Sequence, residues 1–419
     1  MTVTVNTEAL SGTVPAIPSK SYAHRMLICA AFSEKPCRIF CTSGSEDILA
    51  TIRCLNAMGA SITFENGVIE VMPVDRKAMP SFASMDCGES GSTLRFLLPV
   101  ACALGIEGEF VMHGRLGQRP LSPLYEELLR HGARLAPQGT QPFSVSGRLT
   151  DPHFVIAANV SSQFISGLLF ALPLMGGGTI RMTGEIQSGS YLDITAECMR
   201  LAGIDVTQQG DTYHVQGTYC MPPESTVQGD WSNAAFWLCA GAIGTRPVTV
   251  TGLRLDSAQG DRKILDVLER FGADVRKTED SVTVSSTKLS GIVLDASDIP
   301  DLVPVITAVA CRAEGETIIE HAERLRIKES DRIQSVCALL EAFGADYEER
   351  PDGMIIRGGT PLHGAAVSSC NDHRIVMTAA VMTLLTDSAI TIEQAESVNK
   401  SYPSFYEDYR KLGGQEEES

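Results

Sequence analysis

The sequence predicts an α/β protein of two domains, each built from three copies of one repeated unit. Three observations lead to this prediction. The chain has 419 residues, which is too long for one ordinary hydrophobic core. A leucine-rich segment that ends in glycine recurs about every seventy residues, and a strongly apolar segment recurs with the same period. Two regular signals at one period indicate a repeated supersecondary unit.

The apolar segments predict the first helix of each repeat. Each starts with polar residues and then continues apolar on nearly every face, as in SGSTLRFLLPVACAL. A helix that is apolar all round must be buried. The six copies begin near Ser19, Ser90, Ser161, Ser232, Asp301 and Asn371.

The glycine-ended segments predict the second helix of each repeat. Glycine adopts positive φ without steric penalty, so it suits the position that follows a helix. Alternating text such as SITFENGVIEV follows the first five copies and predicts a pair of strands. The six glycines are Gly59, Gly132, Gly203, Gly272, Gly344 and Gly413. Each repeat therefore reads as a buried helix, a strand, a second helix and a strand pair.

The repeats predict the domain boundaries. Repeats one to three fill residues 19–227, and repeats four to six fill residues 228–419. The strand-like opening segment, residues 1–18, has no helix of its own, so we expect it to complete the second domain and make it discontinuous. The tail GGQEEES is expected to be disordered.

Composition narrows the class of function. A formal net charge of −17 argues against nucleic-acid or anionic-membrane partners. The 12 cysteines form no CxxC pair and most lie in apolar runs, which is typical of buried thiols in a reducing compartment. No metal-ligand motif such as HExxH occurs, so we infer no metal. The first residues do not resemble a signal peptide, no apolar stretch is long enough to span a bilayer, and we expect a cytoplasmic protein.

The starts of the buried helices predict an anion site. N-capping alone explains Ser232, because serine satisfies the free N–H groups of a first turn. Capping does not explain the basic residues at the other starts, such as Lys20 and Arg374. Helix N-termini bind anions, and arginine binds carboxylate and phosphate with two parallel hydrogen bonds. We expect the two domains to direct these ends into a common gap, where two anionic substrates could meet.

Nine short motifs occur in order along the chain: PSKSYAHR, CGESGSTLR, GRLGQRP, VSSQF, SGSYLDIT, IPDL, RIKESDR, NDHR and NKSYP. Through these motifs the chain resembles the enolpyruvyl transferase family, in particular its EPSP synthase branch, over essentially its whole length. The resemblance implies a two-domain inside-out α/β barrel with three βαβαββ units per domain. It also implies transfer of the enolpyruvyl group of phosphoenolpyruvate to the 5-hydroxyl of shikimate 3-phosphate, a step of chorismate and aromatic amino-acid biosynthesis. We further expect a monomer, no cofactor and sensitivity to glyphosate.

The resemblance also implies the site residues. Those expected at shikimate 3-phosphate are Lys20, Ser21, Arg25, Ser161, Ser162, Gln163, Ser188, Tyr191, Asp301 and Lys328. Those expected at phosphoenolpyruvate are Lys20, Gly91, Arg119, Gln163, Arg332, His373, Arg374 and Lys400. Asp301 is expected to be the base at the 5-hydroxyl, Glu329 the acid and then the base at the methylene carbon, and Lys20 their support. The alternatives are that Asp301 only caps a helix and that Glu329 only forms a salt bridge.

The chain departs from the pattern of many relatives at Glu89, Phe96 and Arg324, so no contacts are carried over to Glu89 or Arg324. Two other functions remain possible. A sibling family transfers enolpyruvate to a UDP-amino sugar, but it usually has a cysteine in the loop that reads GRLGQRP here. A non-catalytic anion-binding scaffold would need the cations but not Asp301 and Glu329 together.

Overall fold

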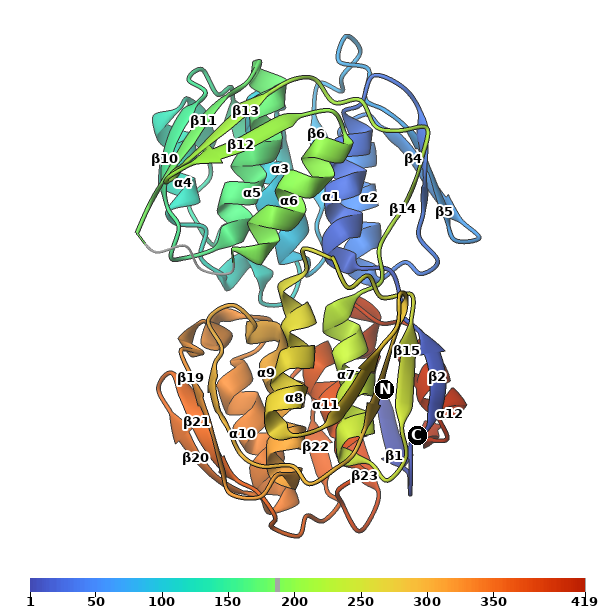
Figure 1. The fold of residues 1–419 in the computed structure, drawn as a ribbon. Helices are drawn as coiled ribbons and strands as arrows, with labels where there is room; N and C mark the ends of the chain where they lie inside the picture. The colour runs from blue at the N-terminus through green and yellow to red at the C-terminus, as the bar shows by residue number, and fades with distance from the viewer. Residues whose placement is uncertain (185–188, 419) are drawn as a thin grey trace. The chain divides into compact units, whose positions relative to one another are not determined.

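The computed structural model describes residues 1–184 and 189–418, and its contacts divide them into two units (Figure 1). The N-terminal unit comprises Pro18–Val227. The C-terminal unit comprises Met1–Ile17 and Gln228–Ser419. The first division therefore lies one residue before the position that we expected from the repeats.

In the described residues, six four-stranded sheets share one arrangement of strands. In each sheet the first strand is parallel to the second, and the third and fourth are antiparallel to their neighbours. The sheets of the N-terminal unit are β14 (Glu224–Thr226), β3 (Cys37–Phe40), β5 (Val68–Met72) and β4 (Ser61–Glu65); β6 (Ala83–Asp86), β7 (Gly108–Val111), β9 (Phe143–Gly147) and β8 (Ala133–Leu135); and β10 (His153–Ala157), β11 (Gly178–Thr183), β13 (Thr212–Gln216) and β12 (Asp205–Gln209). Those of the C-terminal unit are β2 (Gly12–Pro15), β15 (Val248–Thr251), β17 (Ser281–Ser285) and β16 (Asp274–Lys277); β18 (Val293–Asp295), β19 (Glu316–Glu320), β21 (Gly353–Arg357) and β20 (Asp346–Arg350); and β22 (Ala366–Ser368), β23 (Ile390–Glu393), β1 (Thr2–Asn6) and β24 (Gln415–Glu418).

Each repeat contains two helices, as predicted. The first helices are α1 (Lys20–Ala31), α3 (Gly91–Leu104), α5 (Ser162–Ala171), α7 (Trp231–Ile243), α9 (Val303–Arg312) and α11 (His373–Met382). The second helices are α2 (Glu46–Ala57), α4 (Leu124–Arg130), α6 (Ser190–Leu201), α8 (Ile264–Phe271), α10 (Arg332–Phe343) and α12 (Phe405–Lys411). Short 3-10 turns lie at η1 (Leu116–Gln118), η2 (Leu172–Met175), η3 (Gly260–Lys263), η4 (Pro300–Leu302), η5 (Glu323–Ile327) and η6 (Ala395–Lys400).

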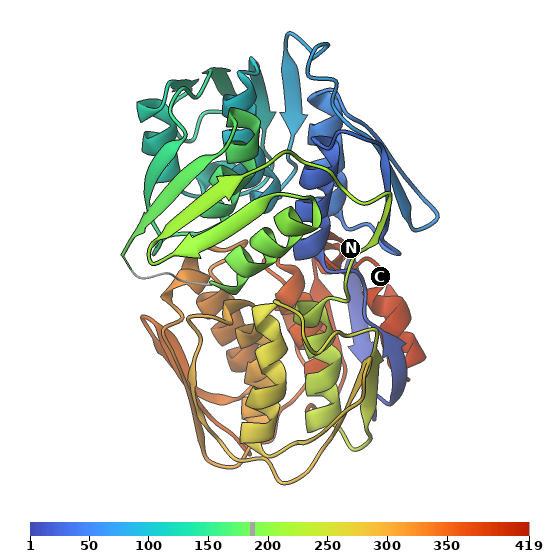
Figure 2. The ribbon, with the colours of Figure 1, turned by 45° about the horizontal axis from the view of Figure 1, so that its top comes forward.

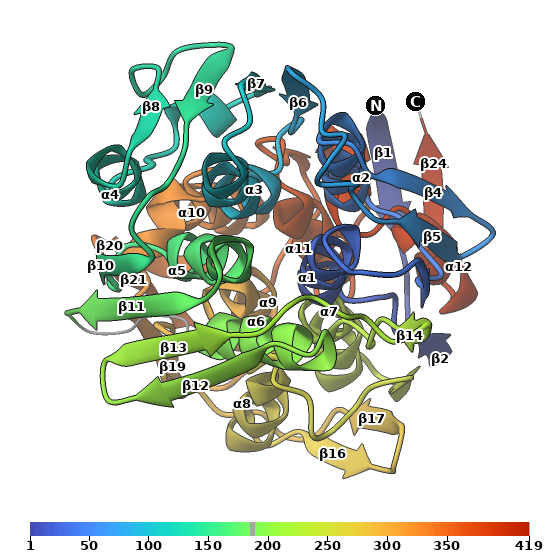
Figure 3. The same cartoon turned by 90° about the horizontal axis from the view of Figure 1, so that it is seen from above.

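The helices form the interior of each unit and the sheets form its outer layer. In α7 and α11 nearly every residue is buried, which is the burial that apolar residues on all faces predict. Figure 2 shows strands of the N-terminal unit lying over its helices, and Figure 3 shows β12 and β13 outside α6. The predicted inside-out α/β architecture is therefore confirmed.

The glycines that end the second helices have the predicted backbone. Their φ angles are 104° at Gly59, 105° at Gly132, 76° at Gly203, 103° at Gly272, 77° at Gly344 and 104° at Gly413. A side chain at such a φ is strained, so glycine is the residue that ends each helix with least penalty. This local requirement explains why a glycine recurs about every seventy residues in the sequence.

Both ends of the chain lie in the C-terminal unit. β2 runs parallel to β15, and β1 lies between β23 and β24 in one sheet. The disorder expected for the tail is wrong, because Gln415–Glu418 pairs with β1 in antiparallel register. Without the tail, the edge of β1 would present unpaired backbone N–H and C=O groups. The backbone of the tail forms hydrogen bonds with these groups, and this pairing does not depend on the side chains of the tail.

The chain's cysteines are unbonded, and most of them are buried. Within residues 1–184 and 189–418, no helix is long and apolar enough to cross a membrane. In the same residues no group of three or more His, Cys, Asp or Glu side chains could hold a metal ion.

Candidate active site

In the N-terminal unit, hydrogen bonds bring the first turns of α3 and α5 together at Gln163. Its side-chain Nε2 donates to Ser92 Oγ at 2.9 Å, and its Oε1 accepts from Arg95 Nη1 at 2.9 Å. Ser161 caps α5 and accepts from the backbone N–H of Gln163, and Ser162 is buried in the first turn. These expected residues therefore share one place. Ser188 lies outside the described residues.

A buried chain of hydrogen bonds ties α1 and α2 to the same end of α3. His24 Nδ1 lies 2.6 Å from Thr51 Oγ1, which lies 2.7 Å from Thr93 Oγ1. Thr93 in turn donates to Ser90, the residue that caps α3. Burial, followed by the charges of Lys20 and Arg25, lowers the pKa of His24 well below its usual value. His24 is therefore neutral at neutral pH, and this row of hydrogen-bonded side chains connects the helices without adding charge.

Lys20, the first residue of α1, is held by a carboxylate that the sequence analysis did not identify. Its Nζ lies 2.8 Å from Asp47 Oδ2, and both side chains are largely buried. Asp47 lies in the first turn of α2, which is capped by Ser45. An aspartate in the first turn of a helix is common, so nothing in the sequence around Asp47 indicated a role in the site.

Arg25 is buried, and the protein itself accepts hydrogen bonds from its guanidinium. Its Nε donates to Thr195 Oγ1, Nη1 to the carbonyl of Ser21, and Nη2 to the carbonyl of Tyr191. Burial lowers its pKa to about 10, so it stays charged at neutral pH. Arg25 thus fixes the backbone at two expected substrate residues, Ser21 and Tyr191.

Gly91 faces two guanidinium groups at the start of α3. A Cβ at this position would lie 2.6 Å from Arg119 Nη1 and 2.8 Å from Arg95 Nη1. Arg95 was not identified from the sequence, yet its Nη2 also donates to the carbonyl of Pro120 and so holds the loop that carries Arg119. A cavity of about 200 Å³ lies beside this loop, lined by Leu94, Leu116, Arg119, Gln138 and Phe143 among others.

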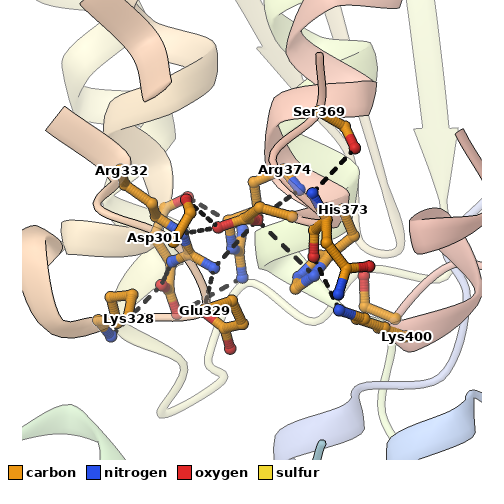
Figure 4. Close-up of polar contacts among 12 residues, drawn as sticks. Asp301, Lys328, Glu329, Arg332, Ser369, His373, Arg374 and Lys400 are labelled. Atoms are coloured by element: carbon orange, nitrogen blue, oxygen red, sulfur yellow. Dashed lines mark hydrogen bonds and ion pairs between the residues drawn. The ribbon is translucent and has the colours of Figure 1, made fainter. Parts of the chain in front are cut away.

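In the C-terminal unit, Arg332 binds three carboxylates (Figure 4). Its Nη1 lies 2.6 Å from Asp301 Oδ1, its Nη2 lies 2.7 Å from Glu329 Oε2, and its Nε lies 2.8 Å from Asp372 Oδ2. The side chain of Arg332 is 1% exposed and that of Glu329 is 23% exposed. Arg332 therefore gathers both expected acid–base residues around one buried cation.

The three carboxylates keep this cation charged. Burial opposes the charge of Arg332, but Asp372, Glu329 and Asp301 outweigh it and raise the pKa well above its usual value. Burial likewise opposes ionisation of Asp372, yet Arg332 and then His373 hold the pKa of Asp372 below its usual value. The salt bridge between Arg332 and Asp372 is therefore fully ionised near neutral pH.

Asp301 has two further cations beside it. Lys328 Nζ lies 3.5 Å from its Oδ1, and Arg374 Nη2 lies 3.4 Å from its Oδ2. Burial lowers the pKa of Lys328, and Asp301 works against that effect. Asp301 lies in η4, two residues before α9 begins, so the alternative that it caps this helix is wrong.

The start of α11 carries the remaining expected residues. Asp372 caps the helix and accepts from the backbone N–H of Arg374 at 3.0 Å. Arg374 also donates from Nη1 to the carbonyl of Asp301, and Lys400 donates to the carbonyl of Asn371 at 2.7 Å. His373, which lies between Asp372 and Arg374 in the sequence, is also buried. Asp301, Lys328, Glu329, Arg332, His373, Arg374 and Lys400 thus belong to one cluster (Figure 4).

The capping role expected for Ser232 is wrong. Asp230 caps α7, and its Oδ1 accepts from the backbone N–H of Asn233 at 2.8 Å. Ser232 instead donates its hydroxyl to the carboxylate of Asp261 in η3. The cap therefore lies two residues before Ser232, and the helix begins at Trp231.

Comparisons with known proteins agree on one family. The family model described as EPSP synthase (3-phosphoshikimate 1-carboxyvinyltransferase) matches residues 5–409. A 3-phosphoshikimate 1-carboxyvinyltransferase of Clostridium kluyveri is 39% identical over 422 residues, which cover 99% of this chain and 98% of that protein. One from Clostridium perfringens is 37% identical over 98% of each chain.

Solved structures give the same picture. EPSP synthase from Acinetobacter baumannii superposes with a TM-score of 0.82 at 26% identity, with 100% of both chains covered. The enolpyruvyl transferase NikO from Streptomyces tendae has a TM-score of 0.77 at 19% identity, covering 99% of this chain and 98% of that one. The second likeness concerns the fold alone.

Proposed function

The chain belongs to the EPSP synthase family, and we propose that its two polar clusters together carry out the reaction of that family. The protein is a transferase of the shikimate pathway that moves the enolpyruvyl group of phosphoenolpyruvate to shikimate 3-phosphate. The observation that carries the assignment of residues is the Arg332 cluster, in which Asp301 and Glu329 lie on one guanidinium. A scaffold that only bound anions would not need two carboxylates among its cations.

Most of the residues assigned to shikimate 3-phosphate in this proposal belong to the N-terminal unit. Ser161 and Ser162 offer hydroxyl and N–H groups at the start of α5, where the helix dipole favours a phosphate. Gln163 is pinned by Ser92 and Arg95, so its position is set before the substrate arrives. Arg25 supports the site by fixing Ser21 and Tyr191. We keep Ser188 and Lys328 as further phosphate ligands.

Four cations are assigned to phosphoenolpyruvate in this proposal: Arg119, beside Gly91, with Lys20, and Arg374 with Lys400 in the cluster that includes His373. These charges offset the repulsion between two substrates that each carry a phosphate and a carboxylate. The offset grows as water is excluded from around the charges.

The transfer needs three proton steps. Asp301 takes the proton of the 5-hydroxyl as its oxygen attacks C2 of phosphoenolpyruvate, and Glu329 gives a proton to the methylene carbon, C3. The tetrahedral phosphate ketal then loses inorganic phosphate while Glu329 takes a proton back from C3, which restores the double bond. Lys20 stabilises the developing charge. Each acid–base group contributes about a hundredfold to ten-thousandfold.

In this proposal Arg332 first binds Glu329 and later binds the carboxylate of phosphoenolpyruvate. In the structure its Nη2 binds Glu329, which favours the ionised carboxylate. When the carboxylate of phosphoenolpyruvate takes that nitrogen, Glu329 loses its cation and its proton affinity rises. Substrate binding thereby converts Glu329 into the acid that the first step requires.

The direct test is to supply phosphoenolpyruvate with one of two acceptors and to follow phosphate release. Shikimate 3-phosphate should release phosphate and give a new enol ether, whereas UDP-N-acetylglucosamine should give neither. Turnover with the UDP-sugar alone would assign the chain to the sibling activity. Absence of turnover with either acceptor, in protein shown to be folded by circular dichroism, would support an anion-binding scaffold.

Two finer properties belong to the same proposal. Free, mostly buried cysteines are typical of a reducing compartment, which supports a cytoplasmic location. We propose a monomer, which sedimentation analysis at assay concentration would test.

A further inference from the structure

Tyr402 is a buried polar residue to which the mechanism above assigns no part. It lies two residues after Lys400 in the motif NKSYP, and only 1% of it is exposed. Its hydroxyl accepts a hydrogen bond from Trp237 Nε1 at 2.8 Å and donates one to Asp408 Oδ2 at 2.9 Å. The directions of both bonds are fixed, because an indole N–H can only donate and a carboxylate can only accept.

The two partners of the hydroxyl belong to elements that lie far apart in the sequence. Trp237 lies in α7 and Asp408 in α12, and both are buried. The ring of Phe405, also in α12, stacks on Trp237 with a centroid distance of 5.0 Å and meets the ring of Tyr402 edge-on at 5.7 Å. Burial first, and then the charge of Asp408, raise the pKa of Tyr402 well above its usual value, so the hydroxyl keeps its proton. Tyr402 is therefore held both by its ring and by its hydroxyl.

Further contacts fix the segment that follows Lys400. The backbone N–H groups of Ser401 and Tyr402 both donate to the same carbonyl within η6, at 3.0 and 2.7 Å. Ser401 Oγ also donates to Asn233 Oδ1 at 3.4 Å. Asn233 and Trp237 are four residues apart in α7, so they lie on one face of that helix. This face of α7 therefore holds the segment on the C-terminal side of Lys400.

The position of the charge of Lys400 depends on this support. Lysine carries a point charge on a flexible stem, so the backbone decides which places its ammonium group can reach. In the structure Nζ donates to the carbonyl of Asn371 at 2.7 Å, two residues before α11 begins at His373 (Figure 4). A shift of the backbone would move this charge away from the anion assigned to it, and a misplacement of about 1 Å can cost about a hundredfold in rate.

We propose that Tyr402 is a positioning residue for the transfer. Its hydroxyl, held between Trp237 and Asp408, fixes the backbone beside Lys400 and so sets where the ammonium group of Lys400 meets phosphoenolpyruvate. The inference deepens the proposed function and rests on the role assigned there to Lys400. Phenylalanine in place of Tyr402 would keep the ring contacts but remove the acceptor of the indole N–H and one donor to the carboxylate.

The test is the steady-state kinetics of the full-length Tyr402→Phe variant with both substrates. The KM for phosphoenolpyruvate should rise about tenfold, which is the effect of losing about one hydrogen bond. The values of kcat and of the KM for shikimate 3-phosphate should stay within about twofold of the wild type. Tyr409→Phe is the matched control, since Tyr409 also lies in α12 and its buried hydroxyl is 3.0 Å from Thr383 Oγ1. This control should lower the melting temperature by a similar amount and leave the kinetic constants unchanged.

Lys400→Met shows whether Tyr402 acts through Lys400. The change removes the ammonium group while keeping much of the volume of the side chain, and it should itself raise the KM for phosphoenolpyruvate. Adding Tyr402→Phe to Lys400→Met should then change this KM by less than about twofold, because the group that Tyr402 positions is gone. A merely structural role of Tyr402 would instead weaken both backgrounds by the same factor.

The proposal is overturned if Tyr402→Phe leaves the KM for phosphoenolpyruvate at the wild-type value, if the increase persists in the Lys400→Met background, or if Lys400→Met alone has no effect on this KM. Should Tyr402→Phe not fold, Ser401→Ala decides the matter. It removes the other side-chain link to α7, and it should raise the same KM in the wild type but not in Lys400→Met. Phosphate release by the wild type is measured in the same series: its absence would refute the proposed function, whereas normal release with unaltered variants would refute only this inference.

Discussion

Asp301 and Glu329 are held by the two terminal nitrogens of one side chain, Arg332, at 2.6 and 2.7 Å. Asp372 binds the third nitrogen of the same guanidinium and also caps α11. One buried residue thus fixes both acid–base candidates and connects them to the helix that carries Arg374. This arrangement makes the fork of arginine, and not only its charge, a requirement of the site.

Replacing Arg332 with lysine should therefore damage both stability and turnover. Lysine keeps the charge but cannot bind three carboxylates in fixed directions, and disrupting a buried ion pair costs about 3–5 kcal/mol when a partner is removed outright. We expect Arg332→Lys to lose about 2 kcal/mol or more of unfolding free energy, measured in urea, and at least a hundredfold in kcat.

Arg326→Lys is the matched control. Arg326 lies in η5 and also binds two carboxylates, Asp331 and Glu349, but it is partly exposed and outside the cluster. Its loss should change stability by less than about 1 kcal/mol and leave kcat unchanged. Equal effects of the two variants would remove the special role of Arg332.

Glu329→Gln should separate chemistry from binding. The amide keeps the size of the side chain and can still accept from Arg332, but it cannot give or take a proton. We expect kcat to fall by about a hundredfold to ten-thousandfold with KM values changed only a few-fold. Glu323→Gln, an exposed change in η5, is the control. Near-normal turnover of Glu329→Gln would assign this proton to another group.

Gly91→Ala should weaken binding without unfolding the protein. The added methyl would approach Arg119 Nη1 at 2.6 Å and Arg95 Nη1 at 2.8 Å, and both are ends of side chains that can move. We expect a higher KM for phosphoenolpyruvate and weaker inhibition by glyphosate, with kcat, the KM for shikimate 3-phosphate and the melting temperature close to normal. Unchanged inhibition would refute this steric argument.

The sequence predicted the features that depend on local backbone and on periodicity. The six glycines with positive φ and the buried first helices follow from residue type alone. The β24 strand was missed because its partner, β1, lies at the other end of the chain. Pairing of a strand edge depends on what the fold leaves open, which the side chains of Gln415–Glu418 do not encode.

The residues of the candidate site also fall into those that the sequence predicted and those that it did not. Residues within motifs, such as Asp301 and Glu329, could be proposed from the sequence because the motifs that carry them match those of a known family. Asp47 and Arg95 were missed because each contacts an expected residue on another element, and only the packing of those elements shows that partner. The expected site was also too cationic, since much of the charge of Arg332 is balanced by carboxylates.

Asp261→Asn should stabilise the protein at alkaline pH. The pKa of Asp261 is raised in the folded state from 3.8 to about 6, so the folded state binds this proton more tightly than the unfolded state does. The ionised carboxyl therefore opposes folding above pH 6, by as much as about 3 kcal/mol, and this penalty disappears below the unfolded value.

The variant should consequently unfold at higher urea concentration than the wild type at pH 8, and the difference should shrink toward zero by about pH 4. Asp266→Asn should show no such pH-dependent difference. A loss of stability in Asp261→Asn at pH 8 would mean that the carboxylate is a favourable structural group, contrary to the burial argument.

Incorporation of solvent deuterium tests most directly whether these carboxylates move protons during transfer. Protonation of the methylene carbon gives a methyl group in the intermediate, and elimination then removes one of its three hydrogens. In D₂O with both substrates, the account predicts deuterium in the methylene of the product from the wild type and almost no labelled product from Glu329→Gln. A product formed at the normal rate with its methylene free of deuterium would contradict the account.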